Sequence, residues 1–340
     1  MLAPLRGPGA LAPGFSLRCT GHGGGPRSRL PGASRLAGRD TLRRALALAL
    51  LATPVRPGRV QRVRPVPQDI ARPPYVDQRV ELDLRSGLPR HPFMYCVEVK
   101  SPEQVESMRK ACGLAREALM VAREAIRPGV STDDVDAAVH EFVVAKQAYP
   151  SPLGYLGFPK SVSTSVNDVI AHGIPDDRPL EDGDILNVDV TVFAEGHHGD
   201  SSCMTGQTFW RSNPRNESRF TVGSVDDAGL ALCKAAQEAM MAGIQACGPG
   251  RDFRAVGRNI QLVADRYGCY VSDLFLGHGV GSYFHGKPEV IPYENNQEEG
   301  EMLPGMTFTV EPVLVEDQDD SYWKWEDGWT FQTHTNARSA

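Results

Sequence analysis

Two aspartates occur in surroundings typical of β-strands. Asp189 lies within the apolar run Leu-Asn-Val-Asp-Val-Thr-Val, and Asp200 follows eleven residues later, after His-Gly. A buried carboxylate is costly unless hydrogen-bond donors or a cation compensate for lost water. We expect two paired strands that bring these carboxylates together, and carboxylates held that close raise each other's pKa unless a cation neutralises them.

Three further residues of this kind follow downstream. His278 is flanked by glycines, His285 comes seven residues later, and Glu311 interrupts an apolar run twenty-six residues after His285. Carboxylate oxygens and imidazole nitrogens suit divalent ions such as cobalt, manganese, iron and zinc. Each residue alone is typical of a turn, a salt bridge or a histidine bonded to backbone, but the set in this order indicates a metal site.

A pair of helices is predicted ahead of these strands. Ser101 and Gln104 form a capping box, with proline at the first helical position, and the helix they start runs to about Ile126. Ser131 or Thr132 can cap a second helix. The apolar stripe of that second helix consists of Val135, Val139, Phe142 and Val143.

The same arrangement recurs 121 residues further along the chain. Residues 112–153 and 233–274 are identical at twelve of 42 positions without a gap, which indicates a duplicated unit. Strand-like runs follow each helix pair, at 162–170, 185–193, 283–293 and 306–315. We expect an α+β fold in which both halves contribute strands to one sheet, helices cover its outer face, and a ligand site lies between the halves.

These motifs resemble those of the type I methionine aminopeptidases, metallopeptidases of the pita-bread fold, from about Pro67 to Ala340. Besides the Asp189, Asp200, His278, His285 and Glu311 segments, the resemblance rests on Tyr-Pro-Ser-Pro-Leu-Gly-Tyr at 149–155, Phe-Pro-Lys-Ser-Val at 158–162 and His-Gly-Ile-Pro at 172–175. It implies a duplicated fold with a curved, mainly antiparallel sheet and helices on the outer face.

The resemblance also implies a role for each residue. Asp189 would bind one of two divalent metal ions (Co, Mn, Fe or Zn), Asp200 would bridge both, and His278 and Glu311 would complete the second position. A water held between the metals would attack the peptide bond after the initiator methionine of nascent proteins with a small second residue. Two histidines, His172 and His285, would be catalytic and contact the substrate. The methionine pocket would be formed by Tyr155, Phe158, Phe284 and Trp329.

Two departures from the family pattern leave alternatives open. The family carries a further metal-bridging glutamate about fourteen residues after the tryptophan matching Trp329, and this sequence stops at Ala340, so the domain is expected to be truncated. Residues 204–220 are interpreted as an inserted loop. The alternatives are therefore an impaired or non-catalytic pita-bread protein that binds polypeptide, or a peptidase specific for Xaa-Pro bonds.

The N-terminal region has a different composition from the rest. Residues 1–64 contain twelve arginines, no lysine and a single acidic residue, Asp40, and 41–52 can form a short helix with an arginine face. This is typical of a mitochondrial transit peptide, and a disordered basic tail is the alternative. Residues 65–96 are predicted to be an extended arm, and 97–340 the catalytic domain.

Composition limits the remaining functions. The net charge of -6 does not favour nucleic-acid binding, and no apolar run reaches the ~20 residues of a membrane span. Seven scattered cysteines without a C-x-x-C pair fit a reducing compartment. We expect a monomer in the mitochondrial matrix that acts on the N-termini of nascent polypeptides near mitochondrial ribosomes.

Overall fold

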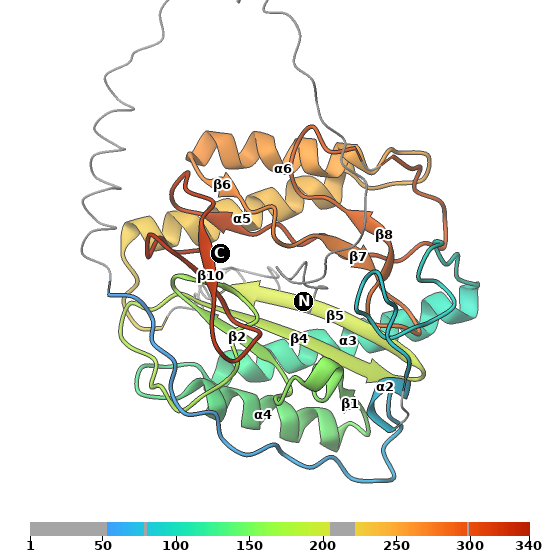
Figure 1. Cartoon of the computed structure of the whole chain (residues 1–340), viewed down its shortest axis with the longest axis horizontal. Coiled ribbons are helices and arrows are strands. Elements are labelled where there is room, and N and C mark those ends of the chain that lie inside the picture. The colour runs from blue at the N-terminus through green and yellow to red at the C-terminus, as the bar shows by residue number, and fades with distance from the viewer. Residues whose placement is uncertain (1–52, 78–79, 205–221, 298) are drawn as a thin grey trace, which may run out of the picture.

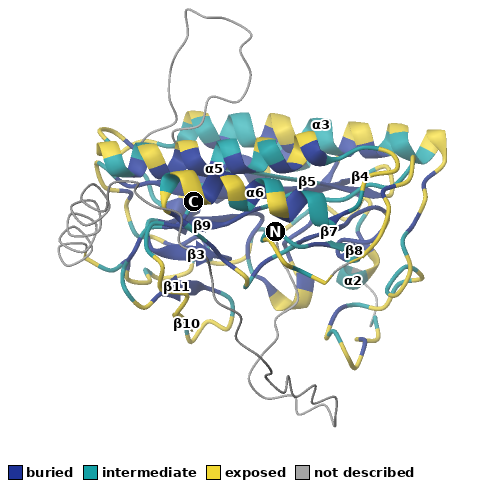
Figure 2. Cartoon of the chain, turned by 90° about the horizontal axis from the view of Figure 1, so that it is seen from above, coloured by how far each residue is buried: buried dark blue, intermediate teal, exposed yellow. Residues whose placement is uncertain are grey.

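The computed structural model describes residues 53–340 except 78–79, 205–221 and 298. The two pairs of helices flank a layer of strands, with α3 and α4 low and α5 and α6 high in Figure 1. Figure 2 shows α3 and α5 on one side of the strands, with exposed residues facing outwards. The predicted leader helix at 41–52 and nearly all of the predicted insertion at 204–220 lie outside the described residues.

The first helix pair begins with the predicted capping signals. Helix α3 (Pro102–Ala125) has Ser101 as its N-cap, and the reciprocal bonds between Ser101 and Gln104 are both present. Helix α4 (Thr132–Ala145) is capped by Ser131 rather than Thr132, in a second capping box with Asp134. The predicted stripe of α4 is confirmed, because Val135, Val139 and Val143 are buried and Phe142 is partly buried.

The second helix pair reproduces the first. Helices α5 (Asp227–Ala246) and α6 (Arg254–Tyr267) end and begin at nearly the positions that a shift of 121 residues predicts. The short strand β1 (Tyr149–Pro150) after α4 corresponds to β6 (Tyr270–Val271) after α6. Gly129 and Gly250, which follow the first helix of each pair, both have positive φ angles, a conformation that favours glycine. The predicted duplication is confirmed.

Within the described residues all strand pairs are antiparallel, but hydrogen bonds divide them into four sheets rather than the single sheet predicted. The largest sheet has β4 (Leu186–Ala194) at its centre, with β5 (His197–Met204) on one side and β1 and β2 (Ser163–Val166) paired with it as well. The other sheets contain β3 (Val169–Ala171) with β10 (Tyr322–Lys324) and β11 (Phe331–Thr333), β6 with β9 (Leu314–Val315), and β7 (Gly277–Gly279) with β8 (Gly286–Val290). Register shifts at His278/Gly279 and at Phe331/Gln332 interrupt the ladders β7–β8 and β11–β3.

Each half has its own hydrophobic core. The first core lies between α3, α4 and the strands β2 and β4, and it includes Val139 and Val190. The second lies between α5, α6 and the strands β8 and β9, and it includes Ile260 and Leu314. A smaller cluster combines Ile170 and Ala171 of the first half with Phe275 and Val313 of the second.

Residues 53–64, predicted to be part of a disordered leader, lie against the first half. Val55 is buried, its N–H donates to Oδ1 of Asp168 (3.1 Å), and its carbonyl oxygen accepts from Nε2 of Gln332 (2.9 Å). A buried apolar residue whose two backbone groups are both bonded is part of the folded protein. The prediction of disorder is therefore wrong for 53–64.

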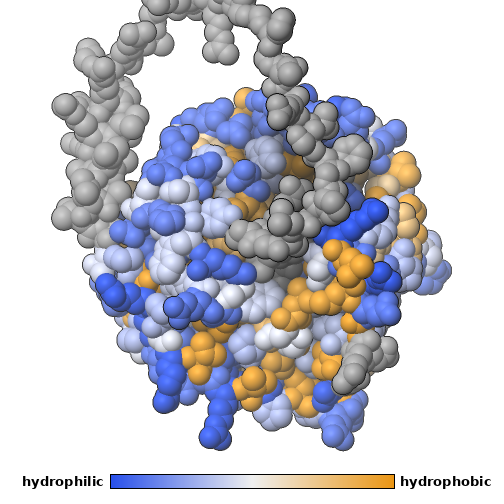
Figure 3. Space-filling view, in the orientation of Figure 1, coloured by the Kyte–Doolittle hydropathy of each residue, from blue (hydrophilic) through white to orange (hydrophobic). Residues whose placement is uncertain are grey.

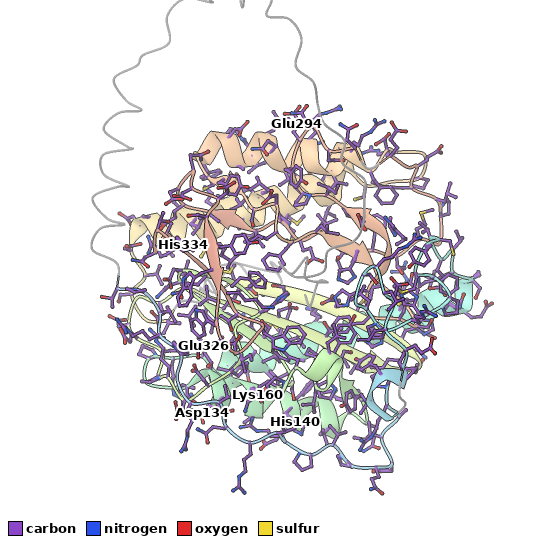
Figure 4. All side chains as sticks on the ribbon, viewed as in Figure 1. Asp134, His140, Lys160, Glu294, Glu326 and His334 are labelled. Carbon is purple, nitrogen blue, oxygen red and sulfur yellow. The ribbon has the colours of Figure 1, made fainter. Side chains whose placement is uncertain are left out.

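Arg64 anchors this segment most firmly. Its guanidinium forms ion pairs of 2.6 Å with Asp133 and Asp136 on α4. The buried ammonium group of Lys160 also pairs with Asp133. Figure 4 shows Lys160 and His140 close to α4, on the side where residues 53–77 run. Such a cluster is costly to break, because each carboxylate would lose its counter-ion in a site shielded from water.

The rest of the predicted arm is also more than a linker. Residues 65–96 contain the short helix α2 (Pro74–Asp77) and contribute buried Ile70 and Leu88 to two small hydrophobic clusters. Figure 3 shows a mostly hydrophilic face on which apolar residues gather in separate small patches. In the described part of the chain, no helix combines the length and apolar character that crossing a membrane requires.

Candidate active site

The β4–β5 hairpin holds the two predicted aspartate ligands. Asp200 stands opposite Thr191, two residues along the strand from Asp189, so both carboxylates project from the same face of the hairpin. Thr191 Oγ1 donates to Oδ1 of Asp200 at 2.8 Å. The residues between them in the alternation, Val188, Val190 and Val192, are buried in the first core. The alternating sequence thus places apolar side chains on one face of the hairpin and the two predicted metal ligands on the other.

His278 brings the second half to the same place. Its Nε2 atom lies 3.5 Å from Oδ2 of Asp200 and 3.5 Å from Oε1 of Glu311. The Nδ1 atom lies 3.1 Å from the carbonyl oxygen of Gly279. Because a carbonyl oxygen only accepts, Nδ1 must donate, and Nε2 is the ring nitrogen that faces the two carboxylates.

Glu311 is held from one side only. Thr309 Oγ1 donates to its Oε1, while Oε2 is buried and has no hydrogen-bond partner among the described residues. Burial raises the pKa of Glu311 to about 7 and that of Asp189 to about 6. At these two carboxylates, burial therefore disfavours the charged form.

The four predicted ligands fit a metal ion by their chemistry. Oxygen and nitrogen acceptors from both halves converge, and one oxygen of Glu311 lacks a partner among the described residues. Within the described ranges, no group of three or more His, Cys, Asp or Glu side chains is arranged so that it could hold a metal ion. The donor set therefore suits a divalent ion, but its side chains would have to move closer to coordinate one.

A cavity of about 850 Å³ lies beside these acceptors. Asp189, Asp200, Glu311 and His172 all line it. His172 follows strand β3 with a positive φ of 60°, and the edges of three aromatic rings surround its imidazole. The adjoining Gly173 is required, because a Cβ there would lie 2.0 Å from a backbone oxygen of β2. The cavity thus joins a predicted substrate residue to three predicted ligands.

His285 is buried next to His278, with 4.3 Å between the ring centroids. Its Nδ1 lies 2.9 Å from the hydroxyl oxygen of Tyr155, and its carbonyl oxygen accepts a hydrogen bond from Nε2 of His91 at 2.8 Å. Its own Nε2 has no partner among the described residues. Burial lowers the pKa of His285 well below its usual value, so the ring is neutral.

The four aromatic residues predicted to bind methionine lie together. Tyr155, Phe158 and Phe284 are buried in one cluster, and Trp329 packs against it. Tyr155 and Phe284 contact the ring of His285, while Trp329 lies between Phe158 and His172. As far as the described residues go, the lining of the large cavity includes none of these four, nor His278 or His285. Their role as a methionine slot stays a prediction.

The sequence analysis missed two supporting threonines. Thr191 donates to Asp200, and Thr309 donates to Glu311 and accepts from the backbone N–H of His278 at 2.9 Å. The signal was present in the sequence, since each threonine lies two residues from a predicted ligand. Residues at i and i+2 share one face of a strand.

Comparisons with known proteins identify the family of the chain. The model of Metallopeptidase family M24 matches residues 106–333. Methionine aminopeptidase 1D, chloroplastic/mitochondrial, from Arabidopsis thaliana is 42% identical over 84% of this chain and 74% of its own length. The mitochondrial methionine aminopeptidase 1D of Homo sapiens is 40% identical over 84% of this chain and 78% of its own.

Solved structures give the same grouping. The methionine aminopeptidase from Rickettsia prowazekii aligns with a TM-score of 0.65 and 35% identity, over 72% of this chain and 92% of that chain. The prolidase from Pyrococcus horikoshii OT3 has a TM-score of 0.51 and 23% identity over 64% of this chain and 56% of that chain, which shows the shared fold alone. By sequence and by fold, the chain belongs to the metallopeptidase family M24, among its methionine aminopeptidases.

Proposed function

We propose that this chain is a metal-dependent aminopeptidase that removes the initiator methionine from polypeptides whose second residue is small. One observation carries the proposal: Nε2 of His278 meets carboxylate oxygens of Asp200 and Glu311 at a buried point between the halves. This point adjoins a cavity large enough for the end of a peptide.

Asp189, Asp200, His278 and Glu311 would hold two divalent ions of the cobalt, manganese, iron or zinc series, with Asp200 shared between them. When bound, such ions supply Lewis acidity, which makes water a nucleophile near neutral pH and stabilises negative charge developing on the peptide carbonyl. The low-dielectric surroundings of the acceptors strengthen both effects.

The remaining residues would bind and orient the peptide. The Nε2 atom of His285 is buried and has no hydrogen-bond partner among the described residues. This nitrogen would form a hydrogen bond with the scissile peptide group of the substrate. His172 would contact the substrate from the other half. Aromatic edges and faces suit a thioether, so Tyr155, Phe158, Phe284 and Trp329 would receive the methionine side chain.

The proposed location is the mitochondrial matrix, where a monomer would act on nascent chains near the mitochondrial ribosome. The arginine-rich residues 1–52 and the relatives named as mitochondrial support it. Protease protection of the tagged full chain in mitochondria and in mitoplasts tests this location. Digestion in intact mitochondria would contradict it.

The activity is tested with the chain from Thr53, which retains every described residue. We expect it to release methionine from a Met-Ala-Ser peptide with manganese or cobalt, and a chelator to stop the release. Glu311→Gln should abolish release, whereas Glu326→Gln, a matched change of an exposed glutamate, should not.

Two outcomes would contradict the proposal. Peptide binding without hydrolysis by folded, metal-loaded protein would favour a polypeptide-binding role. Cleavage confined to Xaa-Pro peptides would favour the other specificity.

A further inference from the structure

Tyr155 and His285 are linked across the two halves of the sequence. Tyr155 opens the 3₁₀ turn η1 (Tyr155–Gly157), which follows Gly154 with its positive φ of 80°. The hydroxyl oxygen of Tyr155 lies 2.9 Å from Nδ1 of His285, although 130 residues separate the two in the chain. Both side chains are almost completely buried, so their polar atoms depend on partners within the protein.

Two proton arrangements are compatible with that distance. In the first, the hydroxyl donates to Nδ1, and the imidazole carries its proton on Nε2. In the second, Nδ1–H donates to the hydroxyl oxygen, and Nε2 is an acceptor.

The second arrangement has the higher free energy, because it leaves more buried polar groups without a hydrogen bond. The hydroxyl proton of Tyr155 would then need another acceptor, and among the described residues Nδ1 of His285 is the one atom found within hydrogen-bond distance of the hydroxyl. Two buried groups, the phenolic O–H and Nε2, would lack partners, instead of Nε2–H alone. Burial raises the pKa of Tyr155, so the hydroxyl keeps its proton.

The surrounding contacts hold both rings in place. The Tyr155 ring contacts Phe284, with 4.8 Å between the centroids. His91 Nε2 donates to the carbonyl oxygen of His285 and its ring stacks on Tyr283 at 4.3 Å, which fixes the backbone beside the histidine. The imidazole of His285 therefore has an anchored backbone and an anchored Nδ1.

We propose that Tyr155 is a positioning residue whose hydroxyl holds His285 in the tautomer with the proton on Nε2, so that this nitrogen presents an N–H donor to the substrate. The inference rests on the proposed function, in which His285 faces the scissile peptide group. A donor favours negative charge as it develops on the carbonyl oxygen, whereas an unprotonated Nε2 would repel it.

The tautomer is measured directly in the metal-free full chain labelled with ¹⁵N-histidine. Long-range ¹H–¹⁵N spectra distinguish protonated from unprotonated ring nitrogens, and the His285→Gln variant assigns the signals. We expect Nε2 of His285 to be protonated and Nδ1 to be unprotonated. The opposite assignment in the unmodified chain would overturn the proposal without any variant.

The Tyr155→Phe variant tests the cause, because it keeps the ring and removes the hydroxyl. We expect His285 to become a mixture of tautomers and kcat for Met-Ala-Ser to fall about tenfold, with KM little changed. In the matched control Tyr75→Phe the tautomer should not change: the Tyr75 ring contacts Tyr155 at 4.9 Å, but its hydroxyl donates to the carbonyl oxygen of Ser151. A Tyr155→Phe protein with a single unchanged tautomer and unchanged kcat would refute the proposal.

The two proposals fail separately. If the full chain releases no methionine but His285 is protonated on Nε2 in a Tyr155-dependent way, the tautomer inference stands and the proposed function fails. If methionine is released while His285 carries its proton on Nδ1, the proposed function stands and the tautomer inference fails.

Discussion

The two halves of the molecule share their helices but differ in their strands. In the first half, β4 pairs with β5 over eight consecutive positions and with β1 and β2 as well. In the second half, the corresponding segment 307–315 forms a ladder of two positions, where β9 pairs with β6. Before β9 its contacts are isolated: Phe308 bridges Gly279, and the N–H of Thr309 donates to the carbonyl oxygen of His278.

This difference shows that duplicated halves can hold their ligands in different ways. Asp189 and Asp200 are fixed by a continuous backbone ladder, whereas His278 and Glu311 depend on a bulge and on the hydroxyl of Thr309. A ladder distributes strain over many bonds, but a single side-chain bond does not. The second half is therefore the more easily perturbed side of the site.

The largest effect is expected from Asp200→Asn, which breaks the point where the halves meet. Loss of the charge that faces His278 should lower methionine release at least about a thousandfold, because a proposed metal ligand is removed. The regular hairpin should still fold, so circular dichroism should be unchanged. Retained activity would show that the halves do not share a site through Asp200.

Next in size is Arg64→Met, which removes the ion pairs that hold residues 53–64 on α4 of the first half. Asp136 would remain buried without its counter-ion, and we expect a loss of about 3 kcal/mol in the free energy of unfolding. Urea unfolding measures it, and amide exchange should rise in α4 more than in α6. Arg59→Met, which breaks an exposed pair with Asp177, is the control. Equal effects of the two variants would refute the anchoring role.

Substitutions of Thr309 and Thr191 test whether the two halves hold their predicted ligands with different firmness. Thr309→Val removes a donor to Glu311 and an acceptor for the His278 N–H, so metal affinity should fall about 10–100-fold. Thr191→Val removes only one donor from Asp200, which the ladder still holds, so we expect about a threefold loss. Titration calorimetry with manganese distinguishes them. A larger loss for Thr191→Val would reverse the proposed difference between the halves.

The smallest effect concerns the helix starts, where the repeats also differ. Helix α4 has a capping box built on Ser131, whereas the N-cap of α6 is Phe253, whose side chain forms no capping hydrogen bond. Ser131→Ala should lower the free energy of unfolding by about 1 kcal/mol, as measured in urea. No measurable change would mean that α4, like α6, is held by packing alone.

Much of the candidate site followed from local patterns. The alternation around Asp189 predicted a strand with one buried face, and Thr191 could have been found from the same alternation. By contrast, the proximity of His278 to Asp200 involves residues 78 positions apart, and no periodicity reports such a distance. The contribution of 53–64 was missed because its composition resembles that of the arginine-rich leader before it.

The sequence by itself determined the helices, their caps, the duplication and the residue types available for chemistry, because these depend on neighbours along the chain and on periodicity. Only the tertiary structure decided that the strands separate into four sheets, that Arg64 belongs to the folded protein, and that Tyr155 meets His285. Each of these depends on how two separate cores pack together, and the free energy of that packing comes from contacts between residues far apart in the chain.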